Sequence, residues 1–239
     1  MLEMRKVSKT FYGKNRAEVL NQVDFELKEG EITGLTGRSG SGKSTLARLL
    51  LQLEKPDSGQ IFYKGKAMNQ KKRREFAEFR REVQYISQHP ESFFDPFWTL
   101  GRSVREAGKI HRISGKAMEI KLEELMGQMK LDMSVLDRYP YQVSGGEIQR
   151  LSLCRALLLE PKILILDEAS SMLDVSVQAQ ILHLLRELKQ THCLTYLFIS
   201  HDLPVVRWFC DRIFELKDGK VELLRDIPEN SDNICQKIL

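Results

Sequence analysis

The sequence contains little that would place the protein in a membrane or outside the cell. No apolar stretch approaches the roughly 18 to 20 residues that cross a bilayer, and the N-terminus, with Glu3, Arg5, Lys6 and Lys9, has no apolar signal segment. The four cysteines form no CxxC pair, so neither a disulfide framework nor a zinc site is expected. We therefore expect a reduced, intracellular protein with no secretory signal and no membrane span.

Strong charge of one sign is also missing. The sequence has 37 Lys and Arg residues against 33 Asp and Glu residues, a net charge of +4, which does not favour nucleic acid as a partner. The one dense basic stretch, Lys71–Arg74 with Arg80 and Arg81, belongs to a sequence of small net charge. We therefore interpret it as the solvated face of a helix and not as a nucleic-acid surface. No repeat or flexible linker divides the 239 residues, which are numerous enough to bury a sizeable core.

Apolar runs bounded by turns predict an α/β fold. Strands are expected at 31–36, 83–87, 162–166 and 195–199, where the apolar character is continuous, as in parallel strands covered on both faces. A helix is expected at 44–53, because its leucines recur at helical spacing. A second amphipathic helix is expected between the last two strands.

Other segments depart from this alternation. Residues 1–30 and 56–82 resemble short strands that would pack as an antiparallel lobe. Residues 90–160 are expected to be mostly helical. Residues 212–217 and 221–224, joined by Asp-Gly, predict a terminal hairpin.

The segment Gly37–Ser44 has the sequence GRSGSGKS, which matches the phosphate-binding pattern GxxxxGK[ST] between an expected strand and an expected helix. Glycines allow successive backbone N–H groups to turn toward a phosphate, and the helix N-terminus adds its positive dipole end. Lys43 can reach the outer phosphates, and the Ser44 hydroxyl can bind Mg²⁺. The sequence thus predicts a phosphate site at this loop.

Two further segments carry polar groups at the ends of elements. Asp167 and Glu168 follow an apolar strand, so Asp167 is expected beside the phosphate loop at the carboxyl edge of the sheet, where one carboxylate can hold Mg²⁺ and the next can polarise water. In Val143–Glu147, Ser144 and Glu147 fit a helix capping box. Ser-Gly-Gly also fits a second anion-binding nest, and both interpretations stay open.

Taken in order along the chain, these motifs resemble those of the ATP-binding subunits of ABC transporters, and the match runs from about residue 3 to 225. The resemblance is closest to the nickel, dipeptide and oligopeptide import branch, and within it to the nickel-importer type of ATPase subunit. It is carried by Gly37–Thr45, Gln88, Val143–Glu147, Ile163–Glu168, Ser171–Asp174 and His201.

This resemblance implies one ABC-type ATPase domain over residues 1–239, with a P-loop core, an antiparallel β lobe and a helical subdomain at about 90–160. It also implies ATP and Mg²⁺ as cofactors, with ATP held by the loop residues Gly37, Arg38, Ser39, Gly40, Ser41, Gly42, Lys43, Ser44 and Thr45. Ser44, Gln88 and Asp167 would form the Mg²⁺ shell. Glu168 would be the general base.

The remaining roles follow from the same resemblance. His201 would contact the γ-phosphate, Asp174 the opposite protomer, and Phe11 would stack on adenine, with Tyr12 as the alternative. Ser144, Gly145 and Gly146 of one chain would close over ATP held by another chain.

The resemblance also implies partners. They are a second ATPase subunit, two transmembrane permease subunits and an extracytoplasmic solute-binding protein, with this chain on the cytoplasmic face of the membrane. A heterodimer is favoured and a homodimer stays open. Nickel, a metal–chelator complex and short peptides stay open as cargo.

Three departures from the family pattern and two other functions remain. Glu147 stands where the family usually has Gln, Ala169 where it has Pro, and Cys235 alone gives no iron–sulfur site. The alternatives are a soluble ABC-type ATPase and a nucleotide-binding accessory subunit of a phosphonate-degrading complex. The aromatics Phe93, Phe94, Phe97 and Trp98 could be core, but after Gln88 a groove for a permease helix is the favoured interpretation.

Overall fold

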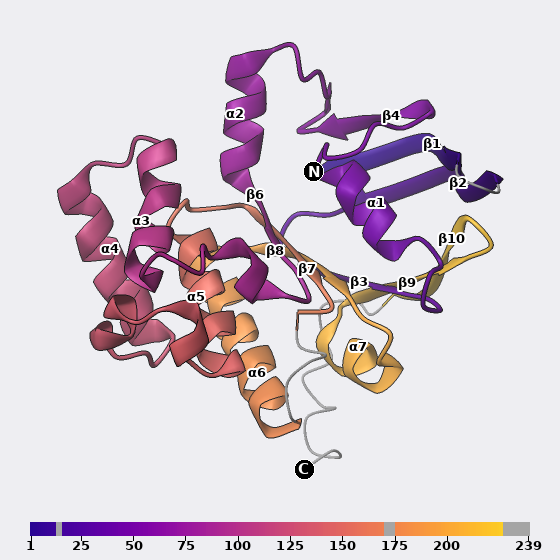
Figure 1. The fold of residues 1–239 in the computed structure, drawn as a ribbon. Coiled ribbons are helices and arrows are strands. Elements are labelled where there is room, and N and C mark those ends of the chain that lie inside the picture. The colour runs from indigo at the N-terminus through magenta and orange to yellow at the C-terminus, as the bar shows by residue number, and fades with distance from the viewer. Residues whose placement is uncertain (13–15, 170–174, 227–239) are drawn as a thin grey trace. The chain divides into compact units, whose positions relative to one another are not determined.

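The computed structural model describes residues 1–12, 16–169 and 175–226 (Figure 1). Two compact units make up the chain. The first comprises residues 1–80, 165–167 and 194 onward, and the second comprises residues 81–164 and 168–193. Asp174 and Cys235, to which the sequence assigns expectations, lie outside the described residues.

An antiparallel sheet in the first unit forms the expected β lobe. Its strands are β1 (Leu2–Tyr12), β2 (Arg16–Leu27), β4 (Ser58–Tyr63) and β5 (Lys66–Ala67), in the order β2-β1-β4-β5. The prediction of short strands is wrong for β1 and β2, which have 11 and 12 residues. Register shifts between Met4 and Thr10 let these long strands twist while still pairing.

The second sheet contains the predicted buried strands. Its strand order is β10-β9-β3-β8-β7-β6, and β3 pairs in parallel with both β8 and β9. Every residue of β3 and β8 is buried, as continuous apolar runs predict. The bounds are β3 Ile32–Thr36, β6 Val83–Ile86, β7 Ile163–Asp167, β8 Thr195–Ile199, β9 Arg212–Lys217 and β10 Lys220–Asp226. The antiparallel pair β9–β10 confirms the predicted hairpin.

The helical subdomain lies in the second unit, where α3, α4 and α5 contact one another (Figure 1). The Arg105 side chain of α3 donates two hydrogen bonds to the Glu119 carboxylate of α4, at 2.7 and 2.8 Å. The helices are α1 Lys43–Leu50, α2 Arg73–Glu82, α3 Leu100–Ile110, α4 Gly115–Gln128, α5 Gly145–Leu157, α6 Val175–His192 and α7 Leu203–Phe209, with 3₁₀ turns at Pro90–Phe93, Met133–Asp137 and Pro140–Gln142.

The expectation of strands throughout 56–82 is wrong for its second half, which forms α2. Phe76 and Phe79 lie one turn apart and stack at 6.0 Å between ring centroids, and Phe79 also meets Tyr63 at 5.3 Å. Strong helix formers, Arg and Glu, occupy most of the remaining positions. The helix expected at 44–53 begins one residue earlier and ends at Leu50, because Gln52 has a left-handed φ of 58° that cannot continue it.

Candidate functional site

The loop between β3 and α1 requires glycine at two positions. Gly37 and Gly42 have φ angles of 149° and 106°, which side chains disfavour. A Cβ at Gly37 would lie 2.5 Å from the Leu216 carbonyl oxygen, and one at Gly42 would lie 2.4 Å from Val19 Cγ1. The backbone is therefore packed against β2 and β9 in a conformation that only glycine allows.

The start of α1 leaves its backbone N–H groups available. Gly42 is the N-cap residue, no side chain caps the helix, and no acidic residue lies in its first turn. The uncompensated N–H groups and the helix dipole favour an anion at this point. The Ser41 hydroxyl is buried with no hydrogen-bond partner among the described residues, so the loop also holds an unused donor.

Lys43 is held over the loop. Its side chain is buried with 6% exposure, and its Nζ donates to the carbonyl oxygens of Gly37 and Arg38 at 2.9 and 3.0 Å. These bonds fix the ammonium group beside the same backbone turn that presents the N–H groups of the loop. A positive charge and oriented donors thus converge on one small volume, the arrangement that phosphate oxygens need.

Oxygen ligands for a cation are available in the same unit. Asp167 ends β7 and is buried, and the Ser44 hydroxyl lies exposed in the first turn of α1. The described residues contain no group of three or more His, Cys, Asp and Glu side chains that could hold a metal by themselves. A donor set of one carboxylate and one hydroxyl fits Mg²⁺, which keeps several waters and binds phosphate oxygens.

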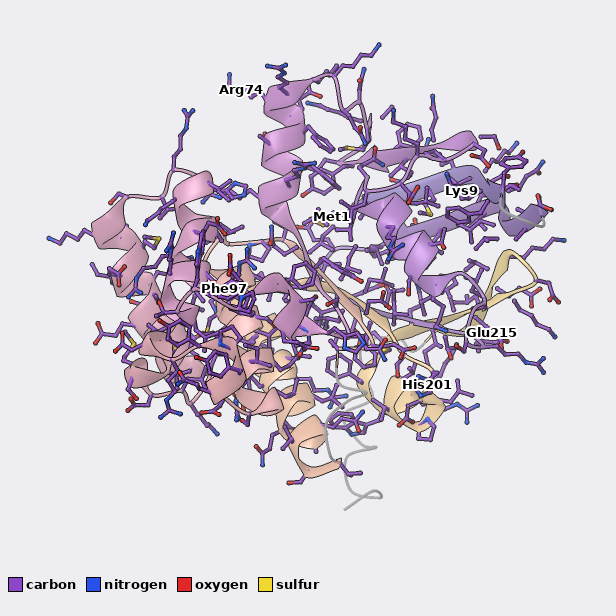
Figure 2. All side chains as sticks on the ribbon, viewed as in Figure 1. Met1, Lys9, Arg74, Phe97, His201 and Glu215 are labelled. Carbon is purple, nitrogen blue, oxygen red and sulfur yellow. The ribbon has the colours of Figure 1, made fainter. Side chains whose placement is uncertain are left out.

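His201 lies at the same sheet edge as the loop. Leu35 of β3 pairs with Ile199 of β8, and both strands run parallel, so their carboxyl ends carry the loop and His201 respectively. The His201 side chain is exposed beside α7 (Figure 2). Asp202, the next residue, caps α7 by accepting from the Val205 N–H at 3.2 Å, which fixes where the chain turns after His201.

Glu168 directly follows Asp167 and has an unusual backbone. Its φ is 50°, in the left-handed region that a residue with a side chain rarely adopts. Nine other described residues that are not glycine share a φ near this value, so the backbone alone does not single out Glu168. The half-buried carboxylate belongs to the second unit.

Phe11 lies near the end of β1, opposite Ala17 of β2. Two residues beyond Ala17, Val19 packs against Gly42 of the loop, so Phe11 lies a short way along the same hairpin from the phosphate site. The Phe11 ring is 39% exposed, and Tyr12 is more exposed still. Sequence reasoning missed that Lys9 places its Nζ 5.1 Å from the Phe11 ring centroid. Its only signal was a lysine two positions earlier on a strand, the spacing of a shared face.

The Val143–Glu147 segment begins α5 and forms the predicted capping box. The Ser144 N–H and hydroxyl both donate to Glu147 Oε2 at 2.8 Å, and the Glu147 N–H donates to Ser144 Oγ at 3.2 Å. Hydrogen bonding from the Ser144 backbone N–H, then from its hydroxyl, lowers the pKa of Glu147, and the Arg138 guanidinium adds to this. The buried Gly146 has little room for a side chain, since a Cβ would lie 3.0 Å from Val177 Cγ1.

Gln88 is half-buried just after β6, and the four aromatics that follow line a cavity of about 420 Å³. Phe94 is buried at 3% exposure, whereas Phe97 is 87% exposed. The Arg102 guanidinium lies 3.7 Å from the Trp98 ring centroid. The core interpretation therefore holds for Phe94, and a groove for a permease helix stays a prediction. We call the four residues the aromatic groove (Phe93, Phe94, Phe97 and Trp98). No helix among the described residues is long and apolar enough to cross a membrane.

Comparison with known proteins identifies the family of the chain. Residues 20–171 match the ABC transporter family. The nickel import ATP-binding protein NikE of Shigella dysenteriae is 44% identical over 88% of this chain and 80% of that protein. A putative peptide import ATP-binding protein of Brucella ovis is 40% identical over 92% of this chain and 70% of that protein.

Solved structures show the same fold. The dimeric, post-hydrolysis form of the ATP-binding cassette MJ0796, bound to ADP and Pi, superposes with a TM-score of 0.81 and 29% identity, over 95% of this chain and all of that one. The fold class of this chain, an α/β core with an antiparallel lobe and a helical subdomain, is the one that the sequence predicts. The family match and these relatives show that the chain belongs to the ABC transporter family, as one of its ATPase cassettes.

Proposed function

We propose that this chain is the ATP-hydrolysing subunit of an importer that takes up nickel, a metal–chelator complex or short peptides. The observation that carries the proposal is the Lys43 ammonium, buried over a glycine loop at an uncapped helix start. The relatives named for nickel and peptide import support the choice of cargo classes.

In this proposal the triphosphate lies in the loop of residues 37–45. Backbone N–H groups bind its oxygens, Lys43 balances the charge of the outer phosphates, and Phe11 stacks on adenine. His201 contacts the γ-phosphate from the end of β8. These groups all belong to the first unit. That unit alone would therefore supply the contacts to adenine and to the phosphates.

Mg²⁺ is the proposed metal, held by Ser44 and Asp167 with Gln88 completing the shell. When bound, it would neutralise charge that develops on the phosphate oxygens. The donor chemistry fits, because every proposed ligand offers an oxygen. Asp167 is buried at the end of its strand. Because a buried carboxylate is costly unless a positive charge lies nearby, a metal ion at this point would stabilise it.

Glu168 is the proposed general base. Its carboxylate would accept hydrogen bonds from the attacking water and orient that water for in-line attack on the γ-phosphate. Its position directly after Asp167, at the end of β7, supports this role.

A second ATPase subunit is the proposed partner across the nucleotide, with a heterodimer favoured. Ser144, Gly145 and Gly146 would then face ATP bound by the other subunit, and Asp174 would contact that subunit. The dimeric form of the related cassette MJ0796 supports this arrangement. Oriented donors supplied by the second chain would stabilise the transferring phosphoryl group.

The membrane partners would be two permease subunits with a solute-binding protein outside, and the chain would act at the cytoplasmic face. The aromatic groove fits a short permease helix, because its exposed Phe97 offers apolar surface beside a buried Phe94 floor. Sensing would pass through Gln88, six residues before Phe94.

The test is recovery of the tagged chain from membranes of its host. Permease subunits should copurify with the wild type and be identified by mass spectrometry, and Phe97→Ala should reduce their recovery while ATP binding stays unchanged. Leu53→Ala, also an exposed apolar residue, is the matched control. Recovery of the wild type without permeases, together with full hydrolysis by the isolated chain, would contradict the importer assignment.

A further inference from the structure

The Phe11 ring is not an isolated aromatic side chain on its strand. The Lys9 side chain is only 13% exposed, its Nζ lies 5.1 Å from the Phe11 centroid, and the same Nζ donates to the Lys55 carbonyl oxygen at 2.8 Å. A cation over an aromatic face is attracted by the π electrons, more so when partly desolvated. Lys9 therefore places a partly desolvated cation beside the Phe11 ring.

Acidic residues from a different segment hold Lys9 in place. Glu54 and Asp57 each approach Lys9 Nζ at 3.7 Å. Asp57 also accepts a hydrogen bond from the Thr10 N–H at 2.7 Å, and its own N–H donates to the Ser8 carbonyl oxygen at 2.9 Å. The strand that carries Phe11 is thus tied, on both sides of Lys9, to the segment that follows α1.

This tie links the two halves of the proposed nucleotide site. The phosphate loop opens α1 at Lys43, and the chain that leaves α1 at Leu50 reaches Asp57 seven residues later. The Phe11 ring keeps 39% of its surface exposed despite Lys9, which leaves apolar surface for a planar ligand. The charged cluster thus joins the strand that carries Phe11 to the segment that follows α1.

We propose that Lys9 is a positioning residue for the base half of the site: it holds Phe11 for stacking, so that it contributes to binding of a nucleoside but not of a bare triphosphate. The inference rests on the proposed function, in which Phe11 meets the base. Stacking tolerates any base, because every base has a π face, so ATP and GTP should depend on Lys9 alike.

The experiment compares Mg-ATP and Mg-tripolyphosphate binding by calorimetric titration of the full chain. Lys9→Gln keeps a donor for the Lys55 carbonyl but removes the cation, and should weaken ATP binding about three- to tenfold without changing tripolyphosphate binding. Lys9→Arg, which keeps the cation, should restore ATP affinity. Lys66→Gln, at an exposed lysine of the same sheet, is the control and should bind both ligands like the wild type.

Other outcomes separate this inference from the proposed function. If Lys9→Gln lowers the affinities for Mg-ATP and Mg-tripolyphosphate equally, Lys9 has only a structural role. If it lowers neither affinity, Lys9 does not act on the site. Either result overturns the inference. If Phe11→Ala leaves ATP affinity unchanged, the base lies elsewhere and the Lys9 inference falls with that assignment. If the wild type binds neither ligand, the proposed function itself fails.

Discussion

The two glycine-containing helix starts of this protein, at α1 and at α5, differ in what occupies their N–H groups. At α1 the cap is a left-handed glycine with no side-chain bond and no acid in the first turn. At α5 the cap is Ser144, whose N–H and hydroxyl both donate to the Glu147 carboxylate. The start of α1 is therefore open to an external anion, whereas the start of α5 already holds the Glu147 carboxylate. We call them the open start and the closed start.

This difference separates a binding feature from a stabilising one. A glycine cap costs the fold roughly a few tenths of a kcal/mol relative to a Ser or Asp cap, and such a start is expected where a ligand supplies the missing partner. The capping box at α5 stabilises the chain without any ligand. A nucleotide from a second subunit would have to compete with Glu147 for the Ser144 hydroxyl, so the two starts should respond differently to the same changes.

The largest effect is expected from removing the proposed general base while the start of α1 stays intact. Glu168→Gln should lower the rate of ATP hydrolysis by about 10²- to 10⁴-fold, because a glutamine cannot accept the proton of the attacking water. ATP affinity should stay within about twofold, since the loop residues are unchanged. Single-turnover hydrolysis and equilibrium binding measure the two quantities. A near-normal rate in the assembled transporter would remove Glu168 from the role of base.

Breaking the open start should mainly affect binding. Lys43→Ala removes the charged donor beside the loop and should weaken ATP binding about 10- to 100-fold, measured by calorimetric titration. Lys162→Ala, which removes a half-exposed lysine paired with Glu82 in the second unit, is the control. Unchanged ATP affinity in Lys43→Ala would place the triphosphate away from α1.

Breaking the closed start should mainly affect stability. Glu147→Ala removes the carboxylate that accepts from the Ser144 N–H and hydroxyl but keeps the backbone N–H that donates to Ser144 Oγ. It should lower the free energy of unfolding by about 1 kcal/mol, measured by urea denaturation. Glu123→Ala, at an exposed position of α4, should change it by less than half as much. If the two variants are equally stable, the capping box contributes nothing and the contrast with α1 loses its energetic basis.

The smallest effect is the pH dependence of that closed start. Because hydrogen bonds from Ser144 lower the pKa of Glu147 in the folded chain, its carboxylate stabilises the fold above the ordinary pKa of a glutamate. That contribution is lost as the pH falls through the lowered pKa. The stability difference between wild type and Glu147→Gln should therefore shrink on acidification below about pH 4.5. A difference that stays constant or grows in acid would contradict the assignment.

The sequence predicts the parts of this protein that are determined by local patterns. The loop of residues 37–44 is recognisable because its glycines satisfy backbone conformations that no other residue allows, and the capping box because its two members are three positions apart. Continuous apolar runs likewise identify the buried strands β3, β7 and β8, since each is covered on both faces.

What the sequence could not predict depends on contacts between distant segments or on a weak local signal. The helix α2 confirms the interpretation of the basic stretch as the solvated face of a helix. The competing expectation of strands was wrong there, because the apolar face consists of little more than Phe76 and Phe79 among charged residues. Lys9 contacts Lys55 and Asp57, which follow it in the sequence by 46 and 48 positions. No rule based on local spacing predicts contacts between residues so far apart. The roles of Gln88, His201 and Asp174 came only from the resemblance and remain predictions.

The contrast between the two helix starts is tested most directly by titrating Mg-ATP into the isotopically labelled chain, at a concentration where it is monomeric, while recording backbone amide NMR signals. We predict that the signals of Gly40, Gly42 and Lys43 shift on binding, while those of Ser144 and Glu147 stay in place. Shifts confined to Ser144 and Glu147, with the loop unmoved, would contradict the account.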